Sequence, residues 1–488
     1  MPLPPATISD EVSIALNNVG DAATGIFTPT LRLGVTGLAR AGKTIYITSL
    51  IHNLLTNAKM PEFEAMAQGR LIGAKLVEHP NKAIPRFAYE QHLADLTNNT
   101  PKWPKSTNRI SQIRIKLKYQ SKDWLKSRLG AKNGLSELNI DIIDYPGEWL
   151  LDLPLLSLSF EQFSEQALKR ASQASSKNQA KDFLVALKKI DANKEANETD
   201  AQILSDSFKQ YLTDSRKDGL ALSTLPPGRF LLPGDMLDSP ALTFSPLTLQ
   251  EKSNRDSLYA MFKRRYEAYK THVIRPFFRD HFARLDRQII LIDALQALNA
   301  GASATLDLQS ALSETLSCFR IGSNNFISHI IAKKIDKIAI AATKADHLHH
   351  TSHQQLAAIV NSLAANATKN AKFSGAEVKA FALASIRTTS EETRIEEGEK
   401  LNMIVGTPQK GEKLDDQTFD GKSEIALFPG DLPKKPESIF DDKTNDIELN
   451  FLRFLPQKKL KLNKNGEVIL PQIRLDQTLE YLIGDWIK

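Results

Sequence analysis

Short runs of apolar residues, each ending at a polar or glycine-containing segment, recur along this chain. They cover residues 31–36, 138–144, 288–293, 335–342 and 378–383. The runs are almost continuously apolar, which is typical of strands buried on both faces of a parallel sheet. Residues 109–119 alternate instead, with apolar side chains at every second position. We therefore predict an α/β fold in which a mostly parallel sheet is flanked by helices on both faces.

Helical patterns fill a long insertion in the middle of the chain. Residues 160–190 and 202–212 are helix-like, and the proline-rich residues 222–246 are expected to form an ordered loop. Apolar residues recur at helical spacing over 258–273. Because proline lacks a backbone N–H, we expect Pro276 to end that helix.

These patterns divide the chain into five segments. They are an N-terminal helical segment (1–30), the first part of the core (31–150), a helical insertion (151–287), the second part of the core (288–390) and a C-terminal α+β appendage (391–488). Strand-like runs at 401–405 and 425–428 give the appendage its short strands. Apolar residues from Leu475 to Trp486 recur at helical spacing, and we expect this helix to pack back on the core. Exposure of the helix to a partner or a membrane is the alternative.

The composition is that of an ordinary globular protein. The 488 residues are 41% hydrophobic and 25% charged, which argues against collagen-like, coiled-coil and wholly disordered chains. One cysteine, Cys318, excludes an internal disulfide framework and a Cys-rich metal site. No apolar run is long enough to span a membrane, and the N-terminus lacks a secretory pattern. We expect a cytoplasmic protein, with peripheral contact at the inner membrane left open. The net charge of +6 is too small to indicate nucleic acid.

A glycine-rich loop stands between the first strand and the helix-like residues 45–55. Its sequence, Gly37-Leu-Ala-Arg-Ala-Gly-Lys-Thr44, is a complete G-x-x-x-x-G-K-[ST] phosphate loop. Its backbone N–H groups can surround a phosphate, and the helix N-terminus adds a favourable dipole. Lys43 would reach the β- and γ-phosphates, and Thr44 would bind Mg²⁺. The expected phosphate-binding residues are Gly37, Leu38, Ala39, Arg40, Ala41, Gly42, Lys43, Thr44 and Ile45.

A second motif follows the strand at 138–144, which runs directly into a D-x-x-G turn from Asp144 to Gly147. Asp144 can support Mg²⁺ through water, and the Gly147 N–H can sense the γ-phosphate. Many small GTPases have a glutamine after this glycine, whereas this chain has Glu148. A carboxylate beside a triphosphate is repelled, so Glu148 would align the attacking water poorly. An exposed residue without a catalytic role is the alternative.

A third motif, Thr343-Lys-Ala-Asp346, follows the strand at 335–342. Asp346 can accept two hydrogen bonds from guanine, while adenine offers no such donor pair and would leave the carboxylate unpaired. ATP is therefore disfavoured. Lys344 would pack its methylene groups over the loop and base. After the strand at 378–383, the loop containing Ser385 and Ile386 stands where a backbone N–H can meet the guanine O6.

The order of these motifs resembles that of TRAFAC-type GTPases. More closely, four segments resemble the bacterial YcjX-like family. They are Gly37-Leu-Ala-Arg-Ala-Gly-Lys-Thr44, Trp103-Pro-Lys-Ser-Thr107, Asp144-Tyr-Pro-Gly-Glu-Trp149 and Thr343-Lys-Ala-Asp-His347. The resemblance covers nearly the whole chain and implies GTP/GDP binding with Mg²⁺, slow hydrolysis and an association with the envelope-stress response. It also implies that Trp103 and His347 lie at the nucleotide.

Two further residues are candidates for catalysis. Thr107 precedes the alternating strand and is preferred over Thr97 and Thr100 as the threonine that completes the Mg²⁺ shell; a loop hydroxyl without a metal role is the alternative. Arg40 occupies a position where guanylate-binding-protein and atlastin-like GTPases also have arginine. This resemblance implies an arginine finger that acts in cis after dimerisation, an effect of about 10³–10⁵ in turnover. A solvated arginine that points away is the alternative.

Other features leave partners open. The basic residues over 263–287 are interpreted as a solvated helix face paired with acids, with an anionic partner surface as the alternative. His347, His349, His350 and His353 are expected to form a polar wall beside the base; a metal bound by His349 and His353 is less favoured, because no carboxylate completes an obvious set. A homodimer and a membrane-associated protein partner remain candidates. The rival functions are a dynamin-like mechanoenzyme and a non-hydrolysing scaffold that holds nucleotide.

Overall fold

The computed structural model describes most of the chain. The described residues are 28–37, 41–105, 109–122, 134–173, 178–215, 226–237, 239–248, 254–317, 335–373, 376–396, 399–440, 449–458 and 460–487. The predicted N-terminal helix and Cys318 lie outside these residues. So do four predicted site residues, which are Leu38, Ala39, Arg40 and Thr107.

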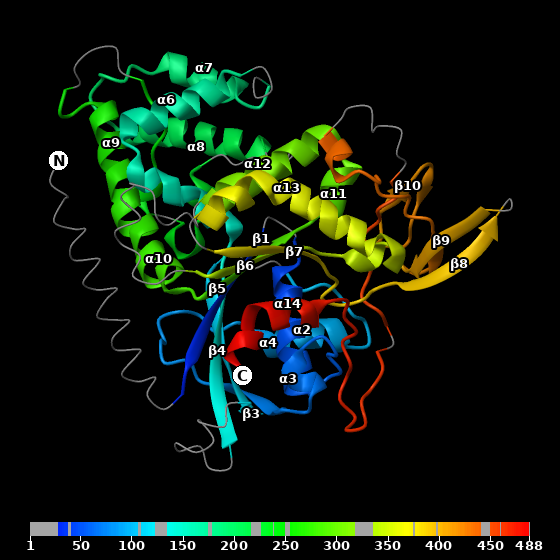
Figure 1. Cartoon of the computed structure of the whole chain (residues 1–488). Helices are drawn as coiled ribbons and strands as arrows, with labels where there is room; N and C mark the ends of the chain where they lie inside the picture. Colours follow the sequence, from blue (N-terminus) through cyan, green and yellow to red (C-terminus); the bar gives the residue numbers. More distant parts are fainter. Residues whose placement is uncertain are drawn as a thin grey trace.

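A seven-stranded sheet forms the centre of the molecule, in the order β2-β3-β4-β1-β5-β6-β7 (Figure 1). The strands are β1 (Thr30–Gly37), β2 (Leu71–Val77), β3 (Ser111–Gln120), β4 (Leu135–Asp144), β5 (Arg287–Ile292), β6 (Lys337–Ala342) and β7 (Glu377–Ala382). Strands β4, β1, β5, β6 and β7 are parallel, and β2 and β3 extend the sheet antiparallel at the β4 edge. The predicted α/β fold with a mostly parallel sheet is confirmed.

The hydrophobic pattern explains which strands lie in the middle. All six residues of β5 are buried, as are seven of the eight in β1. These central strands have helices on both faces, so a continuous apolar run is required. In β3 the apolar side chains at Ile113, Ile115 and Leu117 are buried on one face, and two of the positions between them are only half-buried. This matches the alternation in the sequence.

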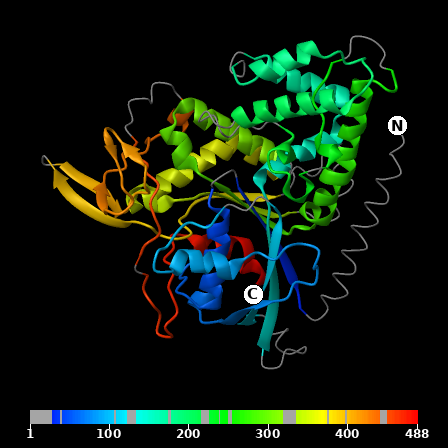
Figure 2. The same cartoon turned by 180° about the vertical axis from the view of Figure 1, so that it is seen from behind.

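Helices cover both faces of the sheet (Figures 1 and 2). One face carries α2 (Lys43–Leu55), α3 (Glu64–Ala67), α4 (Tyr89–Thr97) and α14 (Leu475–Ile483). The other carries α11 (Ala294–Asn299), α12 (Ala302–Ser317) and α13 (His353–Phe373). The terminal helix packs back on the core as expected, because Leu475, Leu479, Leu482 and Ile483 all belong to the apolar cluster shared with α2 and the strands.

The insertion between β4 and β5 is mostly helical. Its α-helices are α6 (Phe160–Ala171), α7 (Lys181–Lys189), α8 (Glu198–Asp214), α9 (Leu258–Tyr269) and α10 (Arg275–Asp280). Its 3₁₀-helices are η2 (Gly147–Ser157), η4 (Gly228–Phe230), η5 (Gly234–Met236), η6 (Pro240–Leu242) and η8 (Phe282–Arg284). Aromatic rings fill its interior, with Phe163 stacked on Tyr266 at 5.0 Å and Phe244 edge-on to Tyr266 at 5.6 Å.

Two expectations for the insertion are wrong. The helix expected over 160–190 is interrupted, because α6 ends at Ala171 and α7 begins at Lys181. Pro276 does not end the helix that begins at Leu258. A π-helical turn, η7 (Lys270–Ile274), follows α9, and α10 then places Pro276 in its first turn. A proline is tolerated there because the first turn of a helix needs no N–H donor.

The appendage adds two small sheets beside the carboxyl end of the central sheet. Strands β8 (Ser390–Glu396), β9 (Glu399–Gly406) and β12 (Ile425–Leu427) form one, and β10 (Lys413–Leu414) and β11 (Gln417–Thr418) form the other. The β8–β9 hairpin projects from the body of the molecule (Figure 2). Single turns at η11 (Pro436–Phe440) and η13 (Gly484–Trp486) complete the chain. No helix among the described residues is long and apolar enough to cross a membrane.

Candidate functional site

The phosphate loop connects β1 to α2. Gly42 adopts φ +80°, a conformation that glycine reaches without strain, and α2 begins immediately after it at Lys43. The first turn of α2 contains no acidic residue, so its positive dipole end is available to an anion. Lys43 and Thr44 therefore stand where a phosphate and its metal ion would bind.

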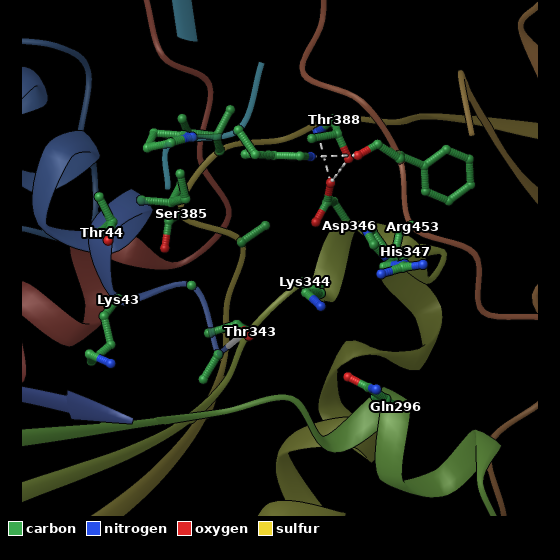
Figure 3. A pocket seen from close by; sticks show the side chains of 18 of the residues that line it. Lys43, Thr44, Gln296, Thr343, Lys344, Asp346, His347, Ser385, Thr388 and Arg453 are labelled. Atoms are coloured by element: carbon green, nitrogen blue, oxygen red, sulfur yellow. Dashed lines mark hydrogen bonds between the residues drawn. The ribbon is translucent and has the colours of Figure 1, made fainter. Parts of the chain in front are cut away.

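A cavity of about 290 Å³ extends from this turn to the loops after β6 and β7 (Figure 3). Twelve of the residues predicted to bind nucleotide line it. On the phosphate side they are Ala41, Gly42, Lys43, Thr44 and Ile45, and on the base side they are Thr343, Lys344, Asp346, His347, Ser385 and Ile386. Trp103 lines it as well. Motifs separated by about 300 residues are thus brought to one cavity.

Asp346 is held firmly at the base side of the cavity. Its Oδ2 accepts hydrogen bonds from the Thr388 backbone N–H at 2.7 Å and from the Thr388 hydroxyl at 2.6 Å (Figure 3). The Thr389 hydroxyl donates to the backbone oxygen of Asp346. Because Asp346 is only 3% exposed, these bonds compensate for its burial and fix the direction of the carboxylate. Thr388 and Thr389 were not predicted as site residues.

Lys344 and Asp293 form an ion pair beside the base loop. Lys344 has a left-handed backbone with φ +61°, and the Asp293 carboxylate also accepts from the Gln296 N–H at the start of α11. Asp293 therefore connects the base loop to the start of α11. On the opposite side, the Ser49 hydroxyl on α2 donates to the Ser385 carbonyl at 2.5 Å. This bond ties the loop after β7 to the helix that follows the phosphate loop.

The appendage forms the outer wall of the base side. Phe454 packs edge-on to His347, with ring centroids 5.1 Å apart, and its carbonyl accepts from the Trp103 indole at 2.9 Å. Burial lowers the pKa of His347, which favours the neutral ring. Arg453 and Gln409 also line the cavity. Sequence reasoning missed these appendage residues and Gln296, because no local motif marks them. Pro104 and Ala384 also line the cavity; they lie within or beside predicted motifs but were not named as site residues.

The D-x-x-G turn lies beside β1 rather than on the cavity wall. Asp144 ends β4 opposite Val35 of β1, and the Tyr145 carbonyl accepts from the Thr36 hydroxyl at 3.2 Å. A Cβ on Gly147 would lie 2.7 Å from the Gly37 carbonyl, so only glycine fits this approach. Asp144, Gly147 and Glu148 are absent from the cavity lining among the described residues.

Glu148 is buried, with 5% of its surface exposed. The interpretation of Glu148 as an exposed switch residue is therefore wrong. The physical reason is that η2, which begins at Gly147, is covered by the turn at Gly228. A Cβ on Gly228 would lie 2.0 Å from the Glu148 carbonyl, so the two backbones are in direct contact.

Asp152 connects η2 to the insertion. Its carboxylate accepts from the Gly228 N–H at 2.7 Å, the Arg229 N–H at 3.2 Å and the Tyr269 hydroxyl at 2.7 Å. Burial raises the pKa of Asp152 to about 6, although these hydrogen bonds oppose the rise. The Arg229 guanidinium lies over the Trp149 ring at 3.2 Å. The segment after the D-x-x-G turn is thus packed directly against the helical insertion.

The residues present fit a magnesium ion at the phosphate side. Thr44 provides a hydroxyl on the first turn of α2, and Asp144 provides a carboxylate at the carboxyl end of β4, the neighbour of β1. A hydroxyl and a carboxylate are the oxygen ligands that Mg²⁺ takes at phosphate sites. The third predicted ligand, Thr107, lies outside the described residues.

The less favoured alternative, a metal ion bound by His349 and His353, does not match the arrangement of the histidines after the base loop. His353 begins α13 and is buried, with its Nε2 3.3 Å from the Leu348 carbonyl. His349 lies instead with His350 and Glu391. The expectation that no carboxylate completes the set is therefore wrong, because the β8 strand that carries Glu391 could not be placed from local sequence.

The basic residues of α9 and α10 are largely paired. Lys263 contacts Glu161 at 2.6 Å, Arg265 contacts Glu198 at 2.5 Å and Arg279 contacts Asp280 at 2.7 Å. These pairs support the interpretation of a solvated face with acidic neighbours. Surface pairs of this kind contribute little to stability individually.

Comparison with known proteins agrees with this geometry. A family model described as YcjX-like family, DUF463, matches residues 31–487. The chain belongs to the YcjX-like family. It is 34% identical over 470 residues to the Ras-like GTPase YcjX of Escherichia coli (strain K12), covering 94% of this chain and 96% of that protein. It is 31% identical over 479 residues to the Ras-like GTPase YcjX of Shewanella oneidensis, covering 94% of this chain and 95% of that protein. The resemblance inferred from the motifs is confirmed.

Proposed function

We propose that this chain binds GTP and GDP with Mg²⁺, hydrolyses GTP to GDP and phosphate, and acts as a nucleotide-dependent conformational switch. The observation that carries the proposal is the pairing of two motifs in one cavity. Lys43 and Thr44 line its phosphate side, and Asp346 lines its base side with Thr388 fixing the carboxylate. The similar proteins are named Ras-like GTPases, which supports the same nucleotide.

In this proposal hydrolysis depends on positioning and charge neutralisation. Lys43 would neutralise the β- and γ-phosphates, and Thr44, Asp144 and Thr107 would hold Mg²⁺. The ion, when bound, would neutralise charge that develops on the phosphoryl oxygens. Gly147 would report the γ-phosphate through its N–H. The buried position of Glu148 away from the cavity lining supports slow turnover without a partner.

The guanine preference rests on Asp346. We expect release of phosphate from GTP but not from ATP, because adenine lacks the paired donors that the carboxylate accepts. Asp346→Asn should lose GTP binding, since its amide would place a donor against the donors of guanine. Equal turnover of GTP and ATP by the unsubstituted chain would contradict the assignment.

Hydrolysis itself is tested by phosphate release from the Lys43→Ala variant. We expect turnover to fall to background. Lys82→Ala, which changes an exposed lysine in the segment between β2 and α4, should keep full turnover. Release that is equal in the parent and in Lys43→Ala would instead favour the non-hydrolysing scaffold.

The proposed arginine finger and dimer are tested by protein concentration. If Arg40 acts in cis after dimerisation, turnover per molecule should rise with concentration, and Arg40→Ala should abolish the rise. If the turnover of Arg40→Ala stays within about twofold of that of the parent at every protein concentration, Arg40 is not an arginine finger. Turnover that is stimulated by liposomes would favour the dynamin-like mechanoenzyme.

The family resemblance extends the proposal to the envelope-stress response of bacteria. The test uses an Escherichia coli strain that lacks its own Ras-like GTPase YcjX. This chain is expressed in that strain, and growth under envelope stress is measured. Rescue by the parent chain and failure of Lys43→Ala would support a nucleotide-dependent role in that response.

A further inference from the structure

A cluster of two histidines and one glutamate lies beside the base loop. His349 and His350 follow Asp346 on the turn before α13, and Glu391 is the second residue of β8. One ligand atom from each of His349, His350 and Glu391 lies within 4.8 Å of the other two. Within the part of the chain that the structure describes, this is the one group of three such side chains close enough to share an ion.

The Glu391 carboxylate already contacts both imidazole rings, and its shorter contact, to His350, is a hydrogen bond that a bound ion would replace. Glu391 Oε2 lies 2.7 Å from His350 Nδ1 and 3.7 Å from His349 Nε2. Ligand atoms about 2.0–2.1 Å from a tetrahedral ion are separated by roughly 3.3 Å, between these two values. Small side-chain adjustments would therefore bring the three atoms to one ion. His350 is 65% exposed, so water can complete the coordination.

Neighbouring groups orient two of the three ligands. His349 Nδ1 lies 3.0 Å from the Thr351 hydroxyl, which can accept its proton and leave the Nε2 lone pair toward Glu391. The Thr351 N–H approaches the same nitrogen at 3.5 Å, which is the weaker contact. Arg387 binds Glu391 Oε1 at 3.1 Å and leaves Oε2 toward the histidines. Support of this kind from outside the ligand set is typical of metal-binding histidines and carboxylates.

The local charge selects among cations. Glu391 is the one carboxylate of the set, and Arg387 pairs with it. Arg387 adds positive charge, which opposes Mg²⁺ and Ca²⁺, ions that depend on several carboxylates. Imidazole suits zinc and related transition metals instead.

We propose that His349, His350 and Glu391 bind one divalent transition-metal ion of the Zn²⁺ class. This site is separate from the phosphate side of the cavity and needs no nucleotide. His349 and His350 lie on the turn that follows Asp346. Glu391 lies three residues after Thr388, whose backbone N–H donates to the Asp346 carboxylate. A bound ion would therefore connect the turn that carries His349 and His350 to β8, the strand that follows Thr388.

The consequence for nucleotide rests on the proposed function. An ion that fixes both segments stabilises the closed base side, which tightens GDP binding and slows the release of GDP. By thermodynamic linkage, GDP then tightens metal binding by the same factor that the metal tightens GDP binding.

Titration with Co²⁺ tests the site directly. GDP and excess Mg²⁺ are present, so that the phosphate-side site is already filled, and the visible absorption of Co²⁺ reports a low-coordinate site with imidazole ligands. We expect one such Co²⁺ ion per chain, and Zn²⁺ should displace it. Glu391→Gln and His350→Asn should each bind Co²⁺ at least about tenfold more weakly than the parent. Glu392→Gln, on the neighbouring residue that pairs with Arg394, should bind as the parent does.

Folding is checked by thermal unfolding, which needs no nucleotide. Zn²⁺ should raise the unfolding temperature of the parent and of Glu392→Gln, but not that of Glu391→Gln. Absence of the Co²⁺ signal from the parent, or equal binding by the parent, Glu391→Gln and His350→Asn, would overturn the site.

The coupling is measured as release of a fluorescent GDP with and without Zn²⁺. Slower release in the parent and no change in Glu391→Gln would support it. Unchanged release at saturating Zn²⁺ would overturn the coupling and leave the metal site standing. Failure of the parent to bind GDP would overturn the proposed function, and the Co²⁺ titration without nucleotide would still decide the metal site.

Discussion

Three glycines permit the closest backbone contacts around η2. A Cβ on Gly37 would lie 2.7 Å from the Leu291 carbonyl, and a Cβ on Gly147 would lie 2.7 Å from the Gly37 carbonyl. A Cβ on Gly228 would lie 2.0 Å from the Glu148 carbonyl. Each added methyl would meet backbone, which cannot move aside as a flexible side chain can. The contacts therefore link the end of β1, η2 and the insertion without intervening space.

Gly228→Ala should destabilise the protein by at least about 2 kcal/mol, because the methyl would displace the Glu148 backbone. Urea unfolding measures the change. Gly73→Ala is the control, since no atom lies within 4 Å of its added Cβ. That substitution should alter stability by less than about 1 kcal/mol, in the stabilising direction. Equal effects of the two substitutions would contradict the close contact at Gly228.

Thr388→Ala should weaken GDP binding roughly ten- to a hundredfold. The variant loses the hydroxyl that donates to Asp346, and a hydrogen bond to a charged group contributes about 1.5–3 kcal/mol. Thr393→Ala, on the exposed part of β8, should bind GDP as the parent does. Titration with a fluorescent GDP compares them. Affinities of the two variants within about twofold of each other would show that the Thr388 hydroxyl does not fix the carboxylate.

The motif residues of the cavity could be predicted because their roles depend on short local patterns. Lys43 belongs to the glycine-rich phosphate loop. Asp346 is the last residue of the four-residue motif Thr343-Lys-Ala-Asp346, which directly follows a buried strand. Thr388, Arg453 and Phe454 could not be found in this way. They reach the cavity through the packing of loops far apart in the chain, and no pattern of spacing carries that information.

At the scale of secondary-structure elements, one buried carboxyl group, that of Asp152, helps to join η2 to the turn at Gly228 and to α9. The pKa of Asp152 rises to about 6 in the folded protein, above the ordinary aspartate value of 3.8. Between about pH 4 and 6 the folded state therefore binds more protons than the unfolded state. The free energy of unfolding contributed by this group falls as the pH rises through that interval, by about 3 kcal/mol in total.

Asp152→Asn removes this titration. We expect the free energy of unfolding of the variant, relative to the parent, to rise by about 3 kcal/mol between pH 4 and 7. Urea unfolding at a series of pH values measures the difference. Asp206→Asn, an exposed carboxyl on α8, should show no such change in the difference. A pH-independent difference for Asp152→Asn would mean that Asp152 titrates as an ordinary aspartate.

Elements were predicted where the local pattern agreed with the tertiary environment. Strands β1 and β5 are apolar because both faces are covered, so their runs were visible in the sequence. Strands β2 and β8 lie at sheet edges, and neither was predicted. Strand β8 is mostly polar or charged, and β2, although mostly apolar, has one buried residue of seven and no regular alternation. Pro276 was misread because the π-helical turn before it changes the hydrogen bonding that a proline would otherwise disrupt.

At the scale of the whole molecule, the terminal helix α14 packs into the hydrophobic cluster that includes α2 and β1, near the start of the chain. Leu479 is buried in the cluster that includes α2 and β1, and the Tyr46 hydroxyl of α2 contacts that of Thr478 at 3.2 Å. Arg287 at the start of β5 pairs with Asp485 at 2.8 Å. The last helix and the first half of the chain therefore fold as one unit.

Leu479→Ala should lower the free energy of unfolding by about 2–5 kcal/mol, because it leaves a cavity between α14 and α2. Leu462→Ala is the matched control, since Leu462 is 61% exposed. Its effect should stay within about 0.5 kcal/mol. Chemical denaturation with a tryptophan fluorescence readout distinguishes them. Similar small effects at both positions would mean that α14 is dispensable for the core.

The contact between Trp103 and Phe454 has a consequence for biosynthesis. The two residues are 351 positions apart, so at about 5–20 residues per second roughly 20–70 seconds of translation separate their synthesis. A nascent chain that has already made its phosphate loop still lacks the wall that Phe454 adds to the base side. The base side of the cavity is therefore complete only in chains whose synthesis has passed the appendage.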